Sequence, residues 1–245
     1  MALYTIADLH LSTHEGTDKS MEVFGGRWSG YTEKLVNNWK RLVSDEDTVV
    51  IPGDISWALS LPEARDDLLL IDSLPGRKII GKGNHDFWWA TLKKLTEFSE
   101  SAGLKTISFL FNNAYLAEGF IVAGTRGWYY DDDSSGVPDG AEFEKIIARE
   151  AGRLKMSLAE AKKLKAQHPE CEIIAFTHFP PVWGERAVEA LVDVLLEAEV
   201  KRLYFGHIHG VYATAPSFEY KGIKMSIISA DYLSFTPKHI PKDEH

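Results

Sequence analysis

Five short motifs along the chain carry side chains that can bind metal ions. In order they are Asp8-Leu9-His10, Gly53-Asp54, Gly83-Asn84-His85-Asp86, Thr177-His178 and Gly206-His207-Ile208-His209. They offer carboxylate, amide and imidazole groups, and five of the nine histidines lie in them, which a random scatter of surface histidines would not produce. Oxygen and nitrogen donors without a thiolate suit Mn, Fe, Zn or Co. The set is large enough for two divalent ions side by side, and such a pair can clamp a phosphoryl group and activate water.

Each motif directly follows a short apolar run that is typical of a β-strand. The runs are residues 2–7, 47–52, 78–81, 172–177 and 201–205. In open α/β folds, functional side chains collect where strands end at one edge of the sheet. Residues two apart in an extended segment point the same way, so we expect Asp8 and His10 to reach one ion together, and likewise His207 and His209.

Any one of these motifs alone is weak evidence. An Asp after a strand is commonly a turn residue or a helix cap. Gly83-Asn84-His85-Asp86 is more specific because four residues are specified together. Asp54 has two carboxylate oxygens and can therefore bridge two ions. The complete ordered set indicates a metal centre.

The remaining apolar patterns predict the fold class. Further strands are expected at 107–111, 120–124 and 224–229, and helices at 31–43, 62–73, 88–102, 139–167 and 185–198, with a possible break at Gly152. Most strand runs are continuous rather than alternating, which predicts strands buried on both faces. Strands that alternate with helices indicate a layered α/β domain. A chain of 245 residues suits one domain, 1–245.

Composition narrows the classes of partner. The net charge is -9 and the pI about 5.5, and no basic patch stands out, so nucleic acid is not an expected partner. Cys171 is the only cysteine, which fits a reducing compartment. The N-terminus lacks the basic region of a signal peptide, and no apolar run approaches the roughly 20 residues of a bilayer span. We expect a cytoplasmic protein without membrane contact.

The ordered motif set resembles that of the calcineurin-like metallophosphoesterase superfamily, in particular its bacterial predicted phosphohydrolases. The resemblance covers the chain from Asp8 to His209, with all five motifs intact. It implies an α/β fold in the form of a four-layer αββα sandwich, with two mostly mixed β-sheets flanked by helices. It also implies an enzyme that hydrolyses phosphoric esters with hydroxide bound to two divalent metal ions, manganese being favoured.

The same resemblance assigns roles to the motif residues. The ligands of the first ion would be Asp8, His10 and His209. Those of the second would be Asn84, His178 and His207. Asp54 would bridge the two ions. The catalytic residues would be His85, which would donate a proton to the leaving oxygen, and Asp86, which would orient His85 through a hydrogen bond.

Departures from the family pattern narrow the substrate. Protein Ser/Thr phosphatases of the superfamily carry Asp-Arg-Gly shortly after Gly-Asp, whereas this chain continues Gly53-Asp54-Ile55-Ser56. We therefore expect a phosphomonoester or phosphodiester of a small or nucleotide-like molecule. One alternative is a nuclease on the same fold, which the acidic charge disfavours. Another is a non-enzymatic metal-binding interaction module, which missing motif residues would have favoured.

Aromatic and basic residues near the motifs suggest substrate contacts. Trp57, Trp88 and Trp183 each closely follow a motif, and they form either an aromatic collar for a flat leaving group or anchors for long loops. Arg27 and Arg126 could each hold a phosphate oxygen or pair within a loop. The acidic segment Asp131–Asp133 is either a lid or simply solvated.

Overall fold

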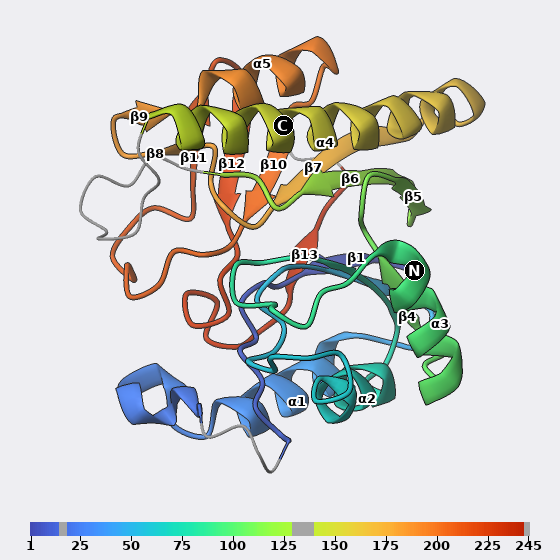
Figure 1. Ribbon diagram of the computed structural model, residues 1–245, viewed down its shortest axis with the longest axis vertical. Coiled ribbons are helices and arrows are strands. Elements are labelled where there is room, and N and C mark those ends of the chain that lie inside the picture. Colours follow the sequence, from blue (N-terminus) through green and yellow to red (C-terminus); the bar gives the residue numbers. More distant parts are fainter. Residues whose placement is uncertain (15–18, 129–139, 243–245) are drawn as a thin grey trace.

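The computed structural model describes residues 1–14, 19–128 and 140–242, and the segment Asp131–Asp133 lies outside them. Two β-sheets stack on each other, and helices cover both outer faces (Figure 1). The predicted four-layer α/β sandwich is thereby confirmed. Within the described ranges, no helix combines the length and apolar character that a bilayer span requires.

The first sheet has five strands in the order β13-β1-β2-β3-β4. Their bounds are Lys238–Ile240 for β13, Leu3–Thr5 for β1, Thr48–Pro52 for β2, Arg77–Gly81 for β3 and Ile107–Phe109 for β4. Strands β1 to β4 are parallel, and β13 pairs antiparallel with β1. The sequence analysis did not identify β13.

The second sheet has six strands in the order β11-β12-β10-β7-β6-β5. Their bounds are Ser217–Tyr220 for β11, Ile223–Ile227 for β12, Arg202–Phe205 for β10, Glu172–Thr177 for β7, Phe120–Thr125 for β6 and Ala114–Ala117 for β5. The four central strands are parallel and the two edge strands antiparallel. A separate short hairpin joins β8 (Val182–Trp183) to β9 (Arg186–Ala187).

Helices α1 (Tyr31–Leu42), α2 (Arg65–Ser73) and α3 (Leu92–Ala102) cover the first sheet, and two 3-10 turns, η1 (Met21–Phe24) and η2 (Gly26–Trp28), precede α1. Helices α4 (Gly140–Gln167) and α5 (Glu189–Glu197) cover the second sheet (Figure 1). Helix α4 continues through Gly152 without the break considered above. A helical glycine costs about 1 kcal/mol, which burial of Leu154 and Leu158 outweighs.

Successive residues of the buried strands contribute to two different cores. In β2, Val49 and Ile51 pack beneath the helices of the first sheet, whereas Val50 faces the second sheet. In β7, Ile174 and Phe176 pack in that same intersheet core. Because both faces of these strands are covered, their sequences are continuously apolar, as predicted.

The segment after β1 connects the two sheets where their parallel strands end. The amide of Ala7 donates to the carbonyl of Ile228 at 2.8 Å, and the carbonyl of Ala7 accepts from the amide of Ala230 at 2.9 Å. One residue later, the amide of Asp8 donates to the carbonyl of Gly53 at 3.0 Å. This short segment is therefore hydrogen-bonded to both sheets and brings their carboxyl ends together.

Candidate metal centre

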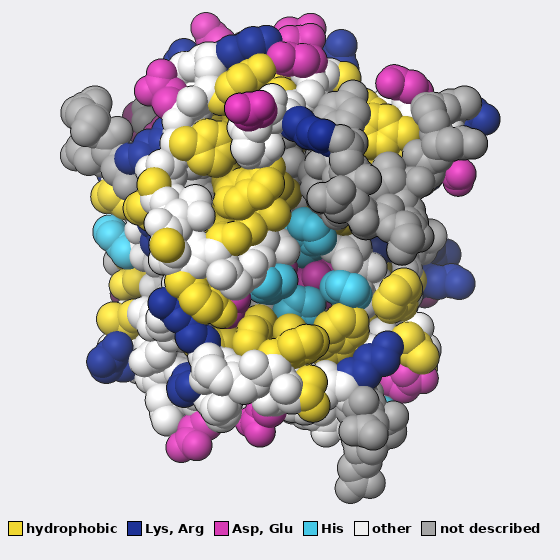
Figure 2. Space-filling view, turned by 90° about the vertical axis from the view of Figure 1, so that its left-hand side faces the viewer, with side chains coloured by type: hydrophobic (Ala, Val, Ile, Leu, Met, Phe, Trp, Pro, Cys, Tyr) yellow, Lys and Arg dark blue, Asp and Glu magenta, His cyan; other side chains and the backbone are white. Residues whose placement is uncertain are grey.

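The five motifs converge at the junction between the carboxyl ends of the two sheets. Loops after β1, β2 and β3 supply the first three motifs, and loops after β7 and β10 supply the other two. Figure 2 shows a group of histidine side chains in a hollow on this face, with hydrophobic side chains on the rim. The motif side chains therefore meet at the carboxyl ends of the strands, where the sequence analysis expected the functional residues.

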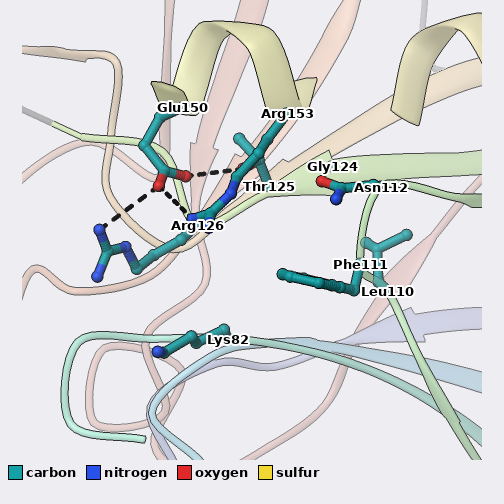
Figure 3. A pocket seen from close by; sticks show the side chains of 9 residues that line it. All are labelled: Lys82, Leu110, Phe111, Asn112, Gly124, Thr125, Arg126, Glu150 and Arg153. Carbon is teal, nitrogen blue, oxygen red and sulfur yellow. Dashed lines mark hydrogen bonds and ion pairs between the residues drawn. The ribbon is translucent and has the colours of Figure 1, made fainter. Parts of the chain in front are cut away.

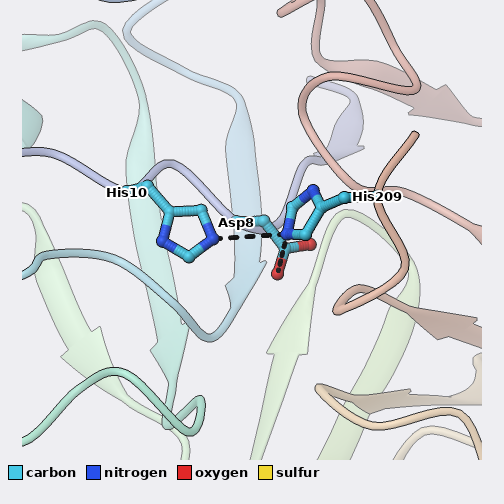
Figure 4. A group of neighbouring side chains, drawn as sticks. All are labelled: Asp8, His10 and His209. Atoms are coloured by element: carbon cyan, nitrogen blue, oxygen red, sulfur yellow. Dashed lines mark hydrogen bonds and ion pairs between the residues drawn. The ribbon is translucent and has the colours of Figure 1, made fainter. Parts of the chain in front are cut away.

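One group of potential ligands consists of Asp8, His10 and His209 (Figure 4). The Nε2 atoms of His10 and His209 lie 3.3 Å apart, and Nε2 of His209 lies 3.8 Å from Oδ1 of Asp8. Asp8 and His10 are almost completely buried. These three residues come from two different sheets, so the group exists only in the folded protein.

A second group consists of Asp8, Asp54 and His178. Oδ2 of Asp54 lies 3.5 Å from Nε2 of His178 and 3.6 Å from Nε2 of His10. The same nitrogen of His178 lies 2.7 Å from Oδ1 of Asn84. Asp54 thus lies between the histidines of the two groups, and Asp8 belongs to both groups.

His207 lies beside the second group. Its backbone amide donates to both carboxylate oxygens of Asp8, at 3.0 and 2.9 Å. Its imidazole ring centre lies 5.3 Å from that of His178. All seven residues proposed as ligands from the sequence are therefore brought together.

The backbone at the site differs from the extended geometry assumed in the sequence analysis. Asp8, His10, Asp54 and His207 all have positive φ angles, of 61°, 46°, 52° and 70°. These are left-handed conformations that non-glycine residues rarely adopt and that concentrate at functional sites. The argument that i and i+2 point the same way along a strand is therefore wrong here, because strand β1 ends at Thr5. Asp8 and His10 meet through turns of the chain instead.

The structure requires a glycine at position 53. Its φ is 107°, and a Cβ at this position would lie 2.6 Å from the backbone nitrogen of Gly83. Only a residue without a side chain allows the loops after β2 and β3 to approach this closely. The close approach brings Asp54 to Asn84 and His85, and the amide of His85 donates to Oδ1 of Asp54 at 2.8 Å.

Burial shifts the pKa values of the carboxyl and imidazole groups in opposite directions, because it disfavours the charged form of each. It raises the pKa of Asp8 to about 6, and burial together with the charges of Asp86 and Asp8 raises the pKa of Asp54 well above its ordinary value. Burial lowers the pKa values of His10 and His178 well below the ordinary value. Metal ligands bind in their deprotonated form, and the neutral imidazoles of His10 and His178 meet this requirement.

Polar atoms without a hydrogen-bond partner also indicate that the site suits metal ions. Among the described residues, no hydrogen-bond partner reaches the buried Nδ1 atoms of His10 and His178. Buried polar atoms are rarely left unpaired without a functional reason. The donor set, its burial and these nitrogen atoms all fit divalent cations of the transition series.

His85 and Asp86 do not pair as the resemblance implied. Nε2 of His85 lies 4.0 Å from Oδ2 of Asp54, and the side chain is 35% exposed, so it faces the hollow beside the ligands. Burial, with His209 and Lys19 nearby, lowers the pKa of His85 to about 4. The fully buried Asp86 carboxylate makes no hydrogen bond to His85 among the described residues.

Asp86 holds the backbone of the loops after β2 and β3. Oδ2 accepts from the amides of Asp54 at 2.9 Å and Gly83 at 2.7 Å, and Oδ1 accepts from the amide of Ile55 at 2.9 Å and the indole Nε1 of Trp88 at 3.0 Å. The expected role of Asp86 is therefore corrected. Asp86 positions the loop that carries Asp54, because both of its carboxylate oxygens accept hydrogen bonds from N–H groups of that loop and of neighbouring residues.

The sequence analysis missed Asp231. Its Oδ1 lies 2.8 Å from Nδ1 of His209, and its Oδ2 accepts from the amide of Gly210 and the hydroxyl of Tyr212. Although burial opposes the change, this hydrogen bond and the charges of Asp8 and Asp231 raise the pKa of His209. A carboxylate on the outer nitrogen fixes the orientation of a ligating histidine. Asp231 also follows an apolar run, 224–229, so the same pattern could have identified it.

The tryptophans near the motifs differ in their surroundings. Trp88 is 2% exposed and donates to Asp86, so it cannot stack on a substrate, and that part of the proposed collar is wrong. Trp57 is partly buried, and its ring stacks on His10 at 4.9 Å and lies 4.2 Å from His85. Trp183 packs on Phe205 in the outer core of the second sheet.

The two arginines also differ. Nη1 of Arg27 donates to the carbonyls of Asp231 and Tyr232, at 2.9 and 3.0 Å, and thus supports the loop that carries Asp231. Nη2 of Arg126 lies 3.5 Å from the carboxylate of Glu150. Arg27 therefore corresponds to the loop-pairing alternative, and Arg126 lines a neighbouring pocket.

Comparisons with known proteins agree with this geometry. The sequence profile of calcineurin-like phosphoesterases matches residues 1–211. A search among curated proteins finds no match.

Two solved structures share the fold. The phosphopantetheinyl hydrolase (PptH) from Mycobacterium tuberculosis has 15% sequence identity and a TM-score of 0.55, and the match covers 99% of this chain and 96% of that one. The protein TT1561 of Thermus thermophilus has 10% identity and a TM-score of 0.55, with 97% of each chain covered. At these identities the likeness concerns the fold alone.

Proposed function

Since the chain belongs to the calcineurin-like phosphoesterase family and is therefore a metal-dependent phosphoric ester hydrolase, we propose that it acts through a dinuclear metal centre on a small phosphorylated molecule. The observation that carries the proposal is the position of Asp54. One carboxylate oxygen lies within 3.6 Å of nitrogen atoms from both His10 and His178. A carboxylate between two groups of ligands is suited to bridging two ions.

The ligand assignment follows the first group, and from the second group it takes His178 together with its neighbours Asn84 and His207. Asp8, His10 and His209 would hold one ion, and Asn84, His178 and His207 the other. When bound, such ions polarise the phosphoryl group and lower the pKa of nearby water. Manganese is the metal that we favour, and iron, zinc and cobalt suit the same donors.

The protein's own residues would bind and orient the ester. The hollow exposes part of His85 beside Asp54, so its imidazole can reach the leaving oxygen of a bound phosphoester. Its low pKa keeps most of the imidazole neutral without substrate. The negative charge of a bound phosphate favours the imidazolium form, so the proton would be taken up together with the substrate.

The proposal is tested by metal analysis combined with hydrolysis of p-nitrophenyl phosphate and bis(p-nitrophenyl) phosphate. We expect up to two transition-metal ions per chain and metal-dependent hydrolysis of at least one ester. Asp54→Asn should lower the occupancy of both sites and abolish most activity, because an amide offers a single oxygen donor. Asp66→Asn removes a carboxylate that is about half exposed and should change neither property.

Full metal occupancy and full activity in Asp54→Asn would overturn the bridging assignment. Metal binding without hydrolysis of either ester would instead favour a non-enzymatic module. Activity confined to polynucleotides would favour the nuclease alternative.

A further inference from the structure

A small pocket lies beside the candidate metal centre, between the carboxyl ends of β3 and β6. Lys82 lies on one wall, and Arg126, Glu150 and Arg153 lie on the opposite wall (Figure 3). The ring of Phe111 lines the same pocket. None of these residues belongs to the motifs that define the metal centre.

The pocket contains more positive than negative charge. The carboxylate of Glu150 is fully buried and accepts from Nη1 of Arg153 at 2.7 Å and from the hydroxyl of Thr125 at 3.0 Å. Nη2 of Arg126 lies 3.5 Å from the same carboxylate. One acidic lining residue thus faces three basic ones, Lys82, Arg126 and Arg153. This excess is local, because the whole chain has a net charge of -9.

Two donors in the pocket are not used by the protein. Within residues 1–14, 19–128 and 140–242, no hydrogen bond or ion pair reaches the ammonium group of Lys82. The Nε atom of Arg126 is buried and likewise has no acceptor in that part of the chain. Unused donors on two basic side chains around one pocket are suited to an anionic ligand.

The pocket shares its walls with the ligand loops. Lys82 precedes Asn84 by two residues in the loop after β3. The carbonyl of Arg126 accepts from the amides of His178 at 3.1 Å and Phe179 at 2.9 Å. An anion in the pocket would therefore be adjacent to a phosphate held by the metal ligands.

We propose that this pocket binds a second phosphate group of the substrate, so that the enzyme prefers small molecules that carry two phosphates. The inference rests on the proposed function, because it takes the metal centre as the site of the first phosphate. A singly phosphorylated molecule would leave the donors of Lys82 and Arg126 unused. The pocket would act in specificity, by binding the part of the substrate that does not react.

The test uses the metal-loaded protein and a matched pair of substrates, butyl phosphate and butane-1,4-diyl bisphosphate, with bisphosphates of shorter and longer spacers. Phosphate release gives kcat/KM for each. We expect a spacer length at which the bisphosphate is favoured over the monophosphate. Lys82→Gln should reduce this preference about 10-fold or more, as for the loss of a hydrogen bond between charged groups.

Two variants serve as controls. Lys82→Arg keeps the charge and should restore most of the preference. Lys94→Gln removes an exposed lysine of α3 and should leave the preference unchanged. Equal losses for the monophosphate and the bisphosphate in Lys82→Gln would place the reacting phosphate at Lys82 and overturn the second-phosphate site.

A binding measurement separates this inference from the proposed function. Calorimetric titration of the metal-loaded protein with the bisphosphate should show tighter binding than with butyl phosphate, and Lys82→Gln should remove the difference. If no phosphoester is hydrolysed but this difference is present, the pocket binds a phosphate and the proposed function fails. If esters are hydrolysed and no spacer length gives a preference, the pocket assignment fails and the proposed function stands.

Discussion

The part of the proposed metal centre that is built on the first sheet is supported differently from the part built on the second. On the first sheet, the buried Asp86 carboxylate accepts from the backbone amides of Asp54, Ile55 and Gly83. These hydrogen bonds fix the main chain of two loops at once. The proposed ligands Asp54 and Asn84 are therefore positioned through their backbone.

On the second sheet, the support acts mainly on a side chain, because among the described residues Asp231 holds only one backbone amide, that of Gly210. Asp231 accepts from His209 at Nδ1, 2.8 Å away, and so orients a single imidazole that is 30% exposed. Loss of the Asp86 hydrogen bonds to backbone amides should disturb the conformation of two loops. Loss of the Asp231 hydrogen bond to His209 should disturb mainly the orientation of one proposed ligand. The two sheets should therefore respond differently to equivalent substitutions.

The largest effect on activity is expected at His85. This residue lies in the loop after β3 of the first sheet, but its imidazole does not hold the loops after β2 and β3 in place. His85→Asn should keep the metal ions and lose roughly 10²- to 10⁴-fold in turnover, the usual contribution of a general acid. The loss should be larger for alkyl phosphates than for p-nitrophenyl phosphate, because p-nitrophenolate hardly needs a proton. Steady-state kinetics on both esters, with elemental analysis, provide the measurement.

Equal losses for the two leaving groups would exclude proton donation by His85. Loss of metal from the variant would make His85 a ligand instead.

A smaller but global effect is expected at Asp86. Asp86→Asn places an amide N–H₂ against backbone N–H donors and should lower the free energy of unfolding by about 3 kcal/mol, the value of one or two hydrogen bonds to a charged group. Urea unfolding measures this change, with Asp66→Asn as the control for loss of an exposed carboxylate. A variant as stable as the parent protein would show that Asp86 does not clamp the loops.

Asp231→Asn should separate metal affinity from stability. Loss of the carboxylate on a ligating histidine weakens metal binding by about 10- to 100-fold. We expect this loss for one ion of the pair, with little change in urea unfolding of the metal-free protein. Titration with a metal indicator measures the affinity, and Asp193→Asn, an exposed residue of α5, is the control. Equal weakening of both ions would contradict the separate supports.

The smallest effects are expected at Trp57 and Trp183, the two partly buried tryptophans of the proposed collar. Trp57 lies against His10 and His85, so Trp57→Ala should lower kcat about 2- to 10-fold, the value of an aromatic contact of ~0.5–1.5 kcal/mol. Trp183 packs on Phe205, so Trp183→Ala should lower the melting temperature and leave kcat of the folded protein unchanged. Identical behaviour of the two variants in both assays would show that Trp57 is only a loop anchor.

Much of the architecture follows from local sequence patterns. The continuous apolar runs identified the central strands of both sheets, because a strand covered on both faces has few polar residues. The edge strands β11 and β13 were missed, because polar residues interrupt them, and β5 was missed although its four residues are all apolar. Within β11, for example, Glu219 is exposed.

The members of the candidate centre could also be named from the sequence, because polar residues directly after buried strands are conspicuous. The roles of their supporting residues could not. In the sequence, Asp86 is simply the neighbour of His85. In the structure, its carboxylate accepts a hydrogen bond from the backbone amide of Asp54, 32 residues away. That partnership depends on the close approach of Gly53 and Gly83, which no local pattern encodes.

The sequence by itself determined the layered α/β class, the strands that carry the motifs and the chemical types of the proposed metal ligands, because these properties depend on residues that are near one another in the chain. Only the tertiary structure decided how the ligands are grouped, that Asp231 supports His209, and that Lys82 and Arg126 line one pocket. The grouping of the ligands and the pocket join residues of different sheets, and the contact of Asp231 with His209 joins loops after two strands of the second sheet. These distances in space depend on how the strands and sheets pack, which the order of residues along the chain does not specify.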